Sequence, residues 1–242
     1  YPNPILTYVK HLKGKHMRVI FNEELKAVAD DLDRMAQDVR KAINGAGDAL
    51  LNQNLEAAQA VIDGDIEIDA LESSVIDQCV KLLAKQNPVA TDLRVVVSTL
   101  RLAATFERMG DLARHIAEAA RRTYPASPLP ADAQPLFAEM QAFLDHVADQ
   151  VVSMLNDRDT KTAEEIILND DKLDALHKKT FELAQSEDWK GTNQQLIDVV
   201  LTGRFMERLG DHAVSAARRV VFIVSGFDPS KEPTRDEGTD ID

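Results

Sequence analysis

Apolar residues recur at spacings of three and four along almost the whole chain, which is the pattern of amphipathic helices. No segment alternates apolar and polar residues as a half-buried strand would, so we expect an all-α protein. Polar or proline-containing turns separate the periodic runs, among them Asn52–Asn54, Asn87–Pro88 and Pro125–Pro130. The six long helices that this pattern predicts cover approximately residues 21–51, 55–85, 91–124, 131–155, 160–186 and 192–225.

The second half of the chain repeats the order of helices in the first half. A shift of the chain against itself aligns Asp65 with Asp170 and Met35 with Met140. A slightly smaller shift aligns the stretch 107–111 with 207–211, and a shortening near Trp189 explains the change. Internal repeats fix the architecture of a protein. We therefore expect two three-helix units, over residues 17–125 and 131–226.

The composition agrees with helices packed through aliphatic side chains, because 44% of the residues are hydrophobic but only 5% are aromatic. No apolar run is long enough for a membrane span. The single cysteine, Cys79, excludes a disulfide framework and favours a reducing cytoplasm. The net charge of −13 disfavours nucleic acid as a partner and favours divalent cations. We expect residues 1–16 to be a remnant of cloning and residues 227–242 to be a disordered acidic tail.

Two stretches with the pattern Glu-Arg-apolar-Gly-Asp are the most informative motifs, at residues 107–111 and 207–211. Each places two carboxylates at i and i+4, on one face of a helix. Each also carries a glycine in mid-helix, at a cost of about 1 kcal/mol relative to alanine. The repetition of a costly residue suggests that the backbone must be approached closely there.

The second helix adds Asp65 and Asp69, again at i and i+4. If the helices pack as antiparallel neighbours, each half brings about four oxygen donors together, which suits Mg, Mn, Fe or Zn. Carboxylate pairs are also common on solvated helix faces, and that interpretation stays open for any single pair. His177 is a further candidate ligand in the second half only, because Glu72 takes its place in the first.

Basic residues follow one another at seven-residue intervals on the third helix, at Arg94, Arg101, Arg108, His115 and Arg122. We call these five residues the basic stripe. It could form ion pairs with acidic neighbours, or it could dock a partner protein, with Arg94, Arg101 and Arg108 as the candidate contacts. The second half lacks most of the stripe.

The chain contains no phosphate-binding Gly-x-x-x-x-Gly-Lys loop and no His-Glu-x-x-His zinc motif, and no nucleophile stands out. A ferritin-like di-iron site needs Glu-x-x-His, but Gly110 and Gly210 stand at the histidine positions. We therefore expect no enzyme. The alternatives that remain are a purely structural helical adaptor without metal and, with less support, a carboxylate-bridged metal oxidase.

These motifs, together with Pro88–Arg94, resemble those of the PhoU family of bacterial phosphate-uptake regulators over about residues 17–226. The resemblance implies two pseudo-symmetric three-helix bundles with metal clusters bound by the acidic motifs. Ser215 departs from the asparagine expected after the second motif. Carried over by position, the metal ligands would be Asp65, Asp69, Glu107, Asp111, Asp170, Asp174, Glu207 and Asp211.

The resemblance further implies a negative regulator of phosphate uptake and phosphate-starvation signalling. Its partners would be the ATPase of the phosphate ABC transporter and a membrane sensor histidine kinase. The protein would lie in the cytoplasm, reach the membrane only through these partners and form a homodimer. The bound metal would be Fe, Zn, Mn or Mg.

Overall fold

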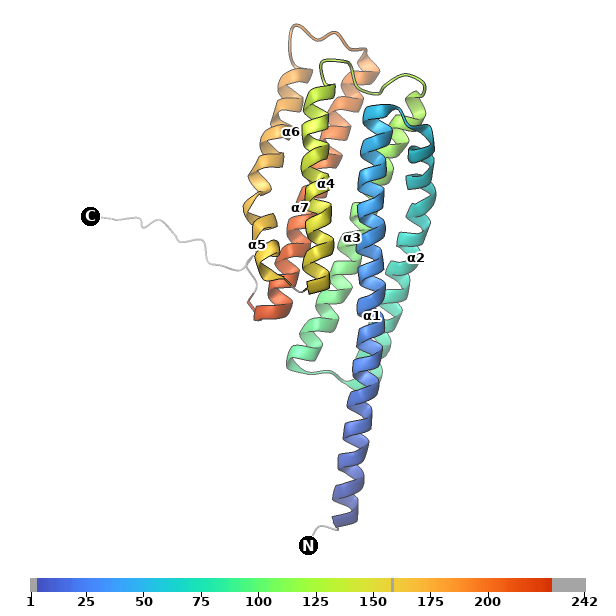
Figure 1. The fold of residues 1–242 in the computed structure, drawn as a ribbon, viewed down its shortest axis with the longest axis vertical. Helices are drawn as coiled ribbons and strands as arrows, with labels where there is room; N and C mark the ends of the chain where they lie inside the picture. The colour runs from blue at the N-terminus through green and yellow to red at the C-terminus, as the bar shows by residue number, and fades with distance from the viewer. Residues whose placement is uncertain (1–3, 158, 228–242) are drawn as a thin grey trace, which may run out of the picture.

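The computed structural model describes residues 4–157 and 159–227, with side-chain surroundings for 19–156 and 159–227. All the regular secondary structure within these ranges is helical, and seven helices run roughly along one axis (Figure 1). Their bounds are α1 Pro4–Asn52, α2 Leu55–Gln86, α3 Ala90–Thr123, α4 Gln134–Asp157, α5 Thr160–Leu168, α6 Asp170–Ala184 and α7 Asn193–Ser225.

Several helices begin or end at the turn residues from which their ends were predicted, and capping contacts hold these ends. The side chain of Asn54 caps the start of α2 by accepting a hydrogen bond from the backbone N–H of Ala57. Thr192 and Gln195 form a reciprocal capping box at the start of α7. Gly226 ends α7 in the left-handed conformation, with φ of 78°, which costs glycine little.

Two helix boundaries differ from the expectation. α1 begins at Pro4, well before Phe21, because proline is tolerated in the first turn and no strong helix breaker follows it. The fifth predicted helix is divided at Asn169 into α5 and α6. Both the backbone N–H and the side-chain amide of Asn169 donate to the carbonyl of Glu165, which satisfies a carbonyl at the end of α5.

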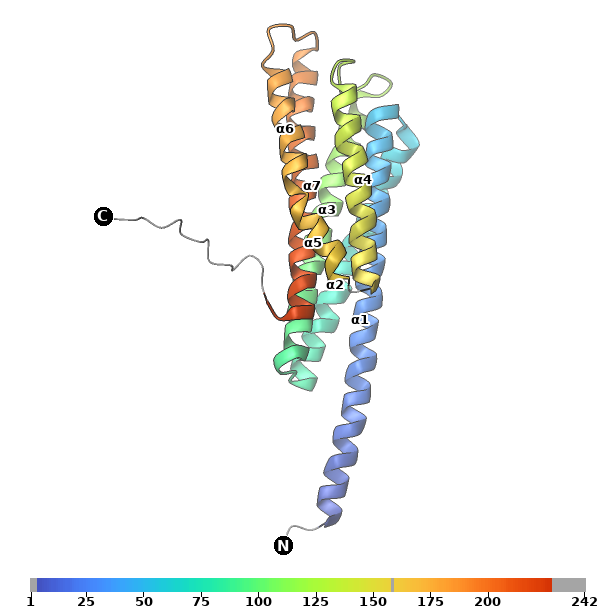
Figure 2. The ribbon, with the colours of Figure 1, turned by 60° about the vertical axis from the view of Figure 1, so that its left-hand side comes forward.

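The helices form two three-rod bundles that lie side by side (Figures 1 and 2). One bundle contains α1, α2 and α3, and the other contains α4, α7 and the broken rod α5–α6. α3 packs on α7 and α1 packs on α4, which joins the two bundles. The expected all-α fold with two pseudo-symmetric bundles is confirmed.

The repeat extends into the core, which is continuous across both bundles. Met35 and Met140, aligned in the sequence, are both fully buried, and so are Ala58 and Ala163. Equivalent positions thus fill equivalent places in the two halves.

No helix in the described ranges has the length and apolar character needed to cross a bilayer. The predicted acidic tail lies outside the described residues, apart from Phe227, as do residues 1–3 of the segment assigned to cloning. The limits proposed for the two repeats remain predictions.

Candidate metal centres

Three carboxylates from two helices converge in the second half. α6 supplies Asp174, and α7 supplies Glu207 and Asp211 from successive turns of one face. One oxygen of each side chain lies within 4.8 Å of the other two, and no other such group of three was found in the described part of the chain. Glu207 is 9% exposed, whereas Asp174 and Asp211 face solvent. This arrangement offers a hard cation three oxygen ligands from one side.

The motif glycines allow the helices that carry these acids to approach closely. A Cβ atom on Gly210 would lie 2.6 Å from Cδ2 of Leu173 on α6. A Cβ atom on Gly110 would lie 3.0 Å from Cδ1 of Ile68 and 3.3 Å from Oδ1 of Asp65, both on α2. The close approach inferred from the two mid-helix glycines is confirmed.

Burial and neighbouring carboxylates make Glu207 and Asp170 costly to charge. Burial, with a further contribution from Asp211, raises the pKa of Glu207 above its ordinary value. Burial also raises the pKa of Asp170, and the charges of Asp174 and Asp211 add to the shift. Asp170 therefore flanks the three-carboxylate group, although it is not a member of it. A cation would relieve this repulsion.

His177 lies near the same carboxylates. Its Nε2 atom is buried and has no hydrogen-bond partner. Burial and the charge of Arg204 lower the pKa of His177, whereas Asp174 and Asp211 act in the opposite direction. The lowered pKa favours the neutral imidazole, which is the form that binds metal. His177 is not a member of the three-carboxylate group, but its unpaired nitrogen lies near two of those carboxylates, Asp174 and Asp211.

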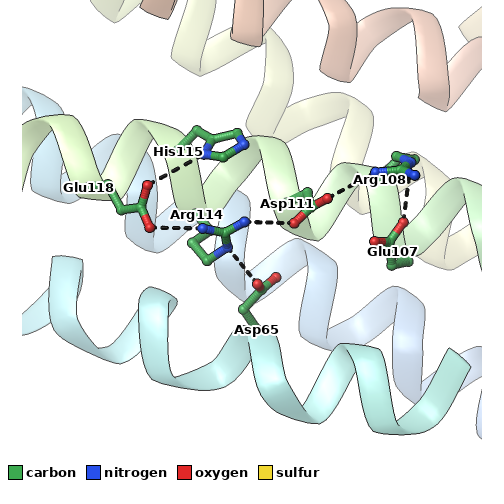
Figure 3. Close-up of polar contacts among 7 residues, drawn as sticks. All are labelled: Asp65, Glu107, Arg108, Asp111, Arg114, His115 and Glu118. Atoms are coloured by element: carbon green, nitrogen blue, oxygen red, sulfur yellow. Dashed lines mark hydrogen bonds and ion pairs between the residues drawn. The ribbon is translucent and has the colours of Figure 1, made fainter. Parts of the chain in front are cut away.

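The first half is arranged differently, because arginines form ion pairs with three of its candidate ligands, whereas among the second-half candidates only Glu207 has an arginine partner within the described residues (Figure 3). Arg114 lies 2.6 Å from Oδ2 of Asp65 and 2.8 Å from Oδ1 of Asp111. Arg108 lies 3.2 Å from Oδ2 of Asp111 and 3.4 Å from Oε2 of Glu107. Asp65, Glu107 and Asp111 each therefore already have a cationic partner.

The pKa values of these first-half acids show the competition between burial and the arginines. For Asp111, burial raises the pKa, but the hydrogen bond from Arg114 and the nearby positive charges outweigh it and lower the pKa. For Asp65, burial outweighs Arg114 and the pKa is raised. Burial and the neighbouring Asp111 raise the pKa of Glu107, and Glu72 and Asp69 contribute in the same direction. Asp69 thus belongs to the acidic surroundings of Glu107.

Sequence reasoning missed Arg114 and Arg204 as members of these sites. Arg114 stands three residues after Asp111 and four before Glu118, and both spacings place the side chains on one helical face. Arg204 stands three residues before Glu207 and donates to its two oxygens at 2.6 and 2.5 Å. Both arginines could have been found from the spacing of opposite charges.

The basic stripe on α3 is directed largely toward α7. Arg94 donates a hydrogen bond to the carbonyl of Ile223 at 3.1 Å, and the ring of His115 lies 5.3 Å from that of Phe205. Arg122 forms an ion pair with Asp198, which is buried on α7. Arg101 is exposed. These contacts give the stripe a role in joining the bundles, and its predicted docking role remains a prediction.

Comparison with known proteins identifies both halves as copies of one domain. The PhoU domain family matches residues 32–120 and 137–220. The chain is 35% identical over 216 residues to the phosphate-specific transport system accessory protein PhoU homolog 1 of Mycobacterium leprae, covering 89% of this chain and 97% of that protein. It is 36% identical to homolog 2 of Mycobacterium tuberculosis over 213 residues, covering 88% of this chain and all of that protein.

Solved structures show the same architecture. The crystal structure of PhoU from Pseudomonas aeruginosa matches with a TM-score of 0.78 at 26% identity, covering 86% of this chain and 100% of that chain. The phosphate transport system regulatory protein PhoU from Streptococcus pneumoniae matches with a TM-score of 0.76 at 22% identity, covering 86% of this chain and 98% of that chain. With both repeats matched and relatives covered over nearly their whole length, the chain belongs to the PhoU family.

Proposed function

We propose that this protein is a negative regulator of phosphate uptake and phosphate-starvation signalling. The observation that carries the proposal is the match to accessory proteins of phosphate-specific transport systems over at least 97% of their length. In this role the protein couples the ATPase of a phosphate ABC transporter to a sensor histidine kinase in the cytoplasm. It acts by binding these partners and not by catalysing a reaction.

Loss of such a regulator should release its target genes. Deletion of the gene is expected to raise transcription of phosphate-responsive genes in phosphate-rich medium, measured with a promoter fusion. Restoration of the wild-type gene should silence the reporter again. Unchanged expression in the deletion strain would contradict the proposal.

The second half supports a metal-binding role within this function. Asp174, Glu207 and Asp211 supply oxygen donors within 4.8 Å of one another, and the orphaned Nε2 of His177 lies in the same surroundings. The three oxygen donors suit Mg or Mn, and a nitrogen ligand from His177 would favour Fe or Zn. A bound metal would neutralise the carboxylates and tie α6 to α7, so that the shape of this bundle depends on metal supply.

Metal analysis tests this role directly. Protein purified without chelator or affinity metal is expected to carry at least one equivalent of metal, measured by elemental mass spectrometry. Asp211→Asn removes one ligand charge at nearly constant volume. It should weaken metal affinity at least about tenfold, the loss that changes of outer-shell partners already cause, and so lower the metal content. Asp188→Asn, in the connection before α7, is a matched control. Equal metal content in the two variants would exclude the proposed site.

The structural adaptor remains the second candidate, and the ion pairs in the first half favour it. Asp65, Glu107 and Asp111 are paired with arginine, so their charges need no metal to balance them. The adaptor predicts sub-stoichiometric metal together with unchanged partner binding. A pull-down of the transporter ATPase and the sensor kinase with Glu107→Ala and Glu207→Ala separates the two, because only a metal-dependent regulator loses binding selectively with Glu207→Ala.

We further propose that the protein forms a homodimer. Ile66, Ile76 and Val80 expose apolar side chains on one face of α2, which no other described helix covers. Exposed apolar side chains on one helix face can mark an association surface. Light scattering coupled to size exclusion should give twice the mass of the chain, and Val80→Glu should shift it toward the monomer. A monomeric wild type at micromolar concentration would contradict the dimer.

A further inference from the structure

Arg114 occupies the centre of the acidic group in the first half. Its guanidinium contacts carboxylates from two helices: Asp65 on α2, and Asp111 and Glu118 on α3. The distances are 2.6, 2.8 and 2.8 Å, and Figure 3 shows the three carboxylates directed at one side chain. The arginine side chain is only 25% exposed, so it is a packed component of the site.

The second half has no cation at the equivalent position. Val214 stands where the repeat aligns Arg114, and it is buried in the core at 4% exposed. Arg204 donates to both oxygens of Glu207, but its side chain is 51% exposed, and no ion pair to Asp174 or Asp211 occurs among the described residues. The two halves therefore place their arginines differently around the same pair of motif acids.

We propose that Arg114 is a built-in cation that takes the place of a metal ion in the first half, so that metal binding is confined to the second half. The inference rests on the metal-binding role proposed above for the second half. It disagrees with the symmetric pair of metal centres that the repeated motif predicts.

The physical reason is competition for the same carboxylate oxygens. A guanidinium stays protonated under all physiological conditions and pairs with carboxylates in a fixed geometry. A divalent cation that entered among Asp65 and Asp111 would have to displace Arg114 or lie beside it, and like charges at such distances repel. Arg108 adds a second positive charge on the other oxygen of Asp111. The donor set of the first half therefore does not fit a metal as it stands.

The repeat supplies a variant that tests this idea, because the second half has valine at the position that Arg114 holds in the first half. Arg114→Val installs the second-half residue in the first half. With Mn²⁺ as the probe, the metal bound per chain is measured by elemental analysis after desalting. The variant is expected to bind about twice as much metal as the wild type. In Arg114→Val combined with Asp211→Asn, the additional metal should persist.

A second comparison does not depend on the folding of the arginine variant. In the wild-type background, Asp111→Asn is expected to leave the bound Mn²⁺ unchanged, while the equivalent Asp211→Asn removes it. Circular dichroism of each variant verifies that the helices are intact. Loss of Mn²⁺ on Asp111→Asn, as large as the loss on Asp211→Asn, would overturn the inference.

The outcomes also separate this inference from the proposed function. If the wild type binds Mn²⁺ through Asp211 but folded Arg114→Val gains none, Arg114 is not the obstacle and the inference fails alone. If the wild type binds no Mn²⁺ but Arg114→Val gains a site, the blocking role of Arg114 stands and the metal role of the second half fails.

Discussion

Asp198 on α7 is 2% exposed, and its carboxylate pairs with Arg122 at the far end of the basic stripe. Removal of the arginine would leave a buried charge without a cation. Arg122→Ala is therefore expected to lower the free energy of unfolding by roughly 2–4 kcal/mol, somewhat less than for a fully buried pair. Urea denaturation followed by circular dichroism measures the change.

The control is Arg101→Ala, an exposed member of the same stripe. It should change the free energy of unfolding by less than about 0.5 kcal/mol, as for most surface substitutions. Equal losses in the two variants would show that the stripe acts through its general charge and not through the buried pair.

Single residues also show where prediction from the sequence ends. The spacing of the acids identified Glu207 and Asp211 as neighbours, because i and i+4 lie on one face. Asp174 was expected as a ligand from the repeat and the family resemblance, but residue spacing alone could not place it within reach of them, because that contact depends on how α6 packs on α7. The three-residue spacing in the sequence was enough to pair Arg114 with Asp111. The contact of Arg114 with Asp65 depends on how α2 packs on α3, which spacing does not give.

At the scale of the helices, two glycines test whether close packing or local conformation decides stability. A Cβ atom on Gly210 would lie 2.6 Å from Leu173, which is buried, so Gly210→Ala is expected to destabilise the protein by about 1–3 kcal/mol. Gly64 in α2 has no heavy atom within 4 Å of such a Cβ, so Gly64→Ala should stabilise by about 0.5–1 kcal/mol. Thermal melts of the pair should shift in opposite directions, and shifts of the same sign would contradict the packing explanation.

The elements themselves were largely predictable, because hydrophobic periodicity and capping residues act locally. The start of α7 after Thr192 and its end at Gly226 follow from such signals. The break at Asn169 was missed, although Gly64 stands at the aligned position of the unbroken α2. Asn169 can bond to the backbone through its side chain, which glycine cannot do, and periodicity does not report such bonds.

For the whole molecule, the shared core predicts that the two bundles unfold together. α3 packs on α7 and α1 on α4, and the buried residues form one cluster. Trp189, the single tryptophan, lies in the second half and packs against this core, so its fluorescence reports that half alone. Circular dichroism reports the helices of both halves. In urea the two transitions are expected to coincide, as two-state unfolding requires; an earlier fluorescence transition would show that the second bundle opens on its own.

The contact between α3 and α7 is unequal, although the helices are copies of one another. α3 contributes the cations, and α7 offers the carboxylate of Asp198, the carbonyl of Ile223 and the ring of Phe205. A chain built from two first halves would set one row of arginines against an identical row, and these would repel. The packing of α3 against α7 therefore requires different residues in the two repeats, and two identical repeats could not form the same contact.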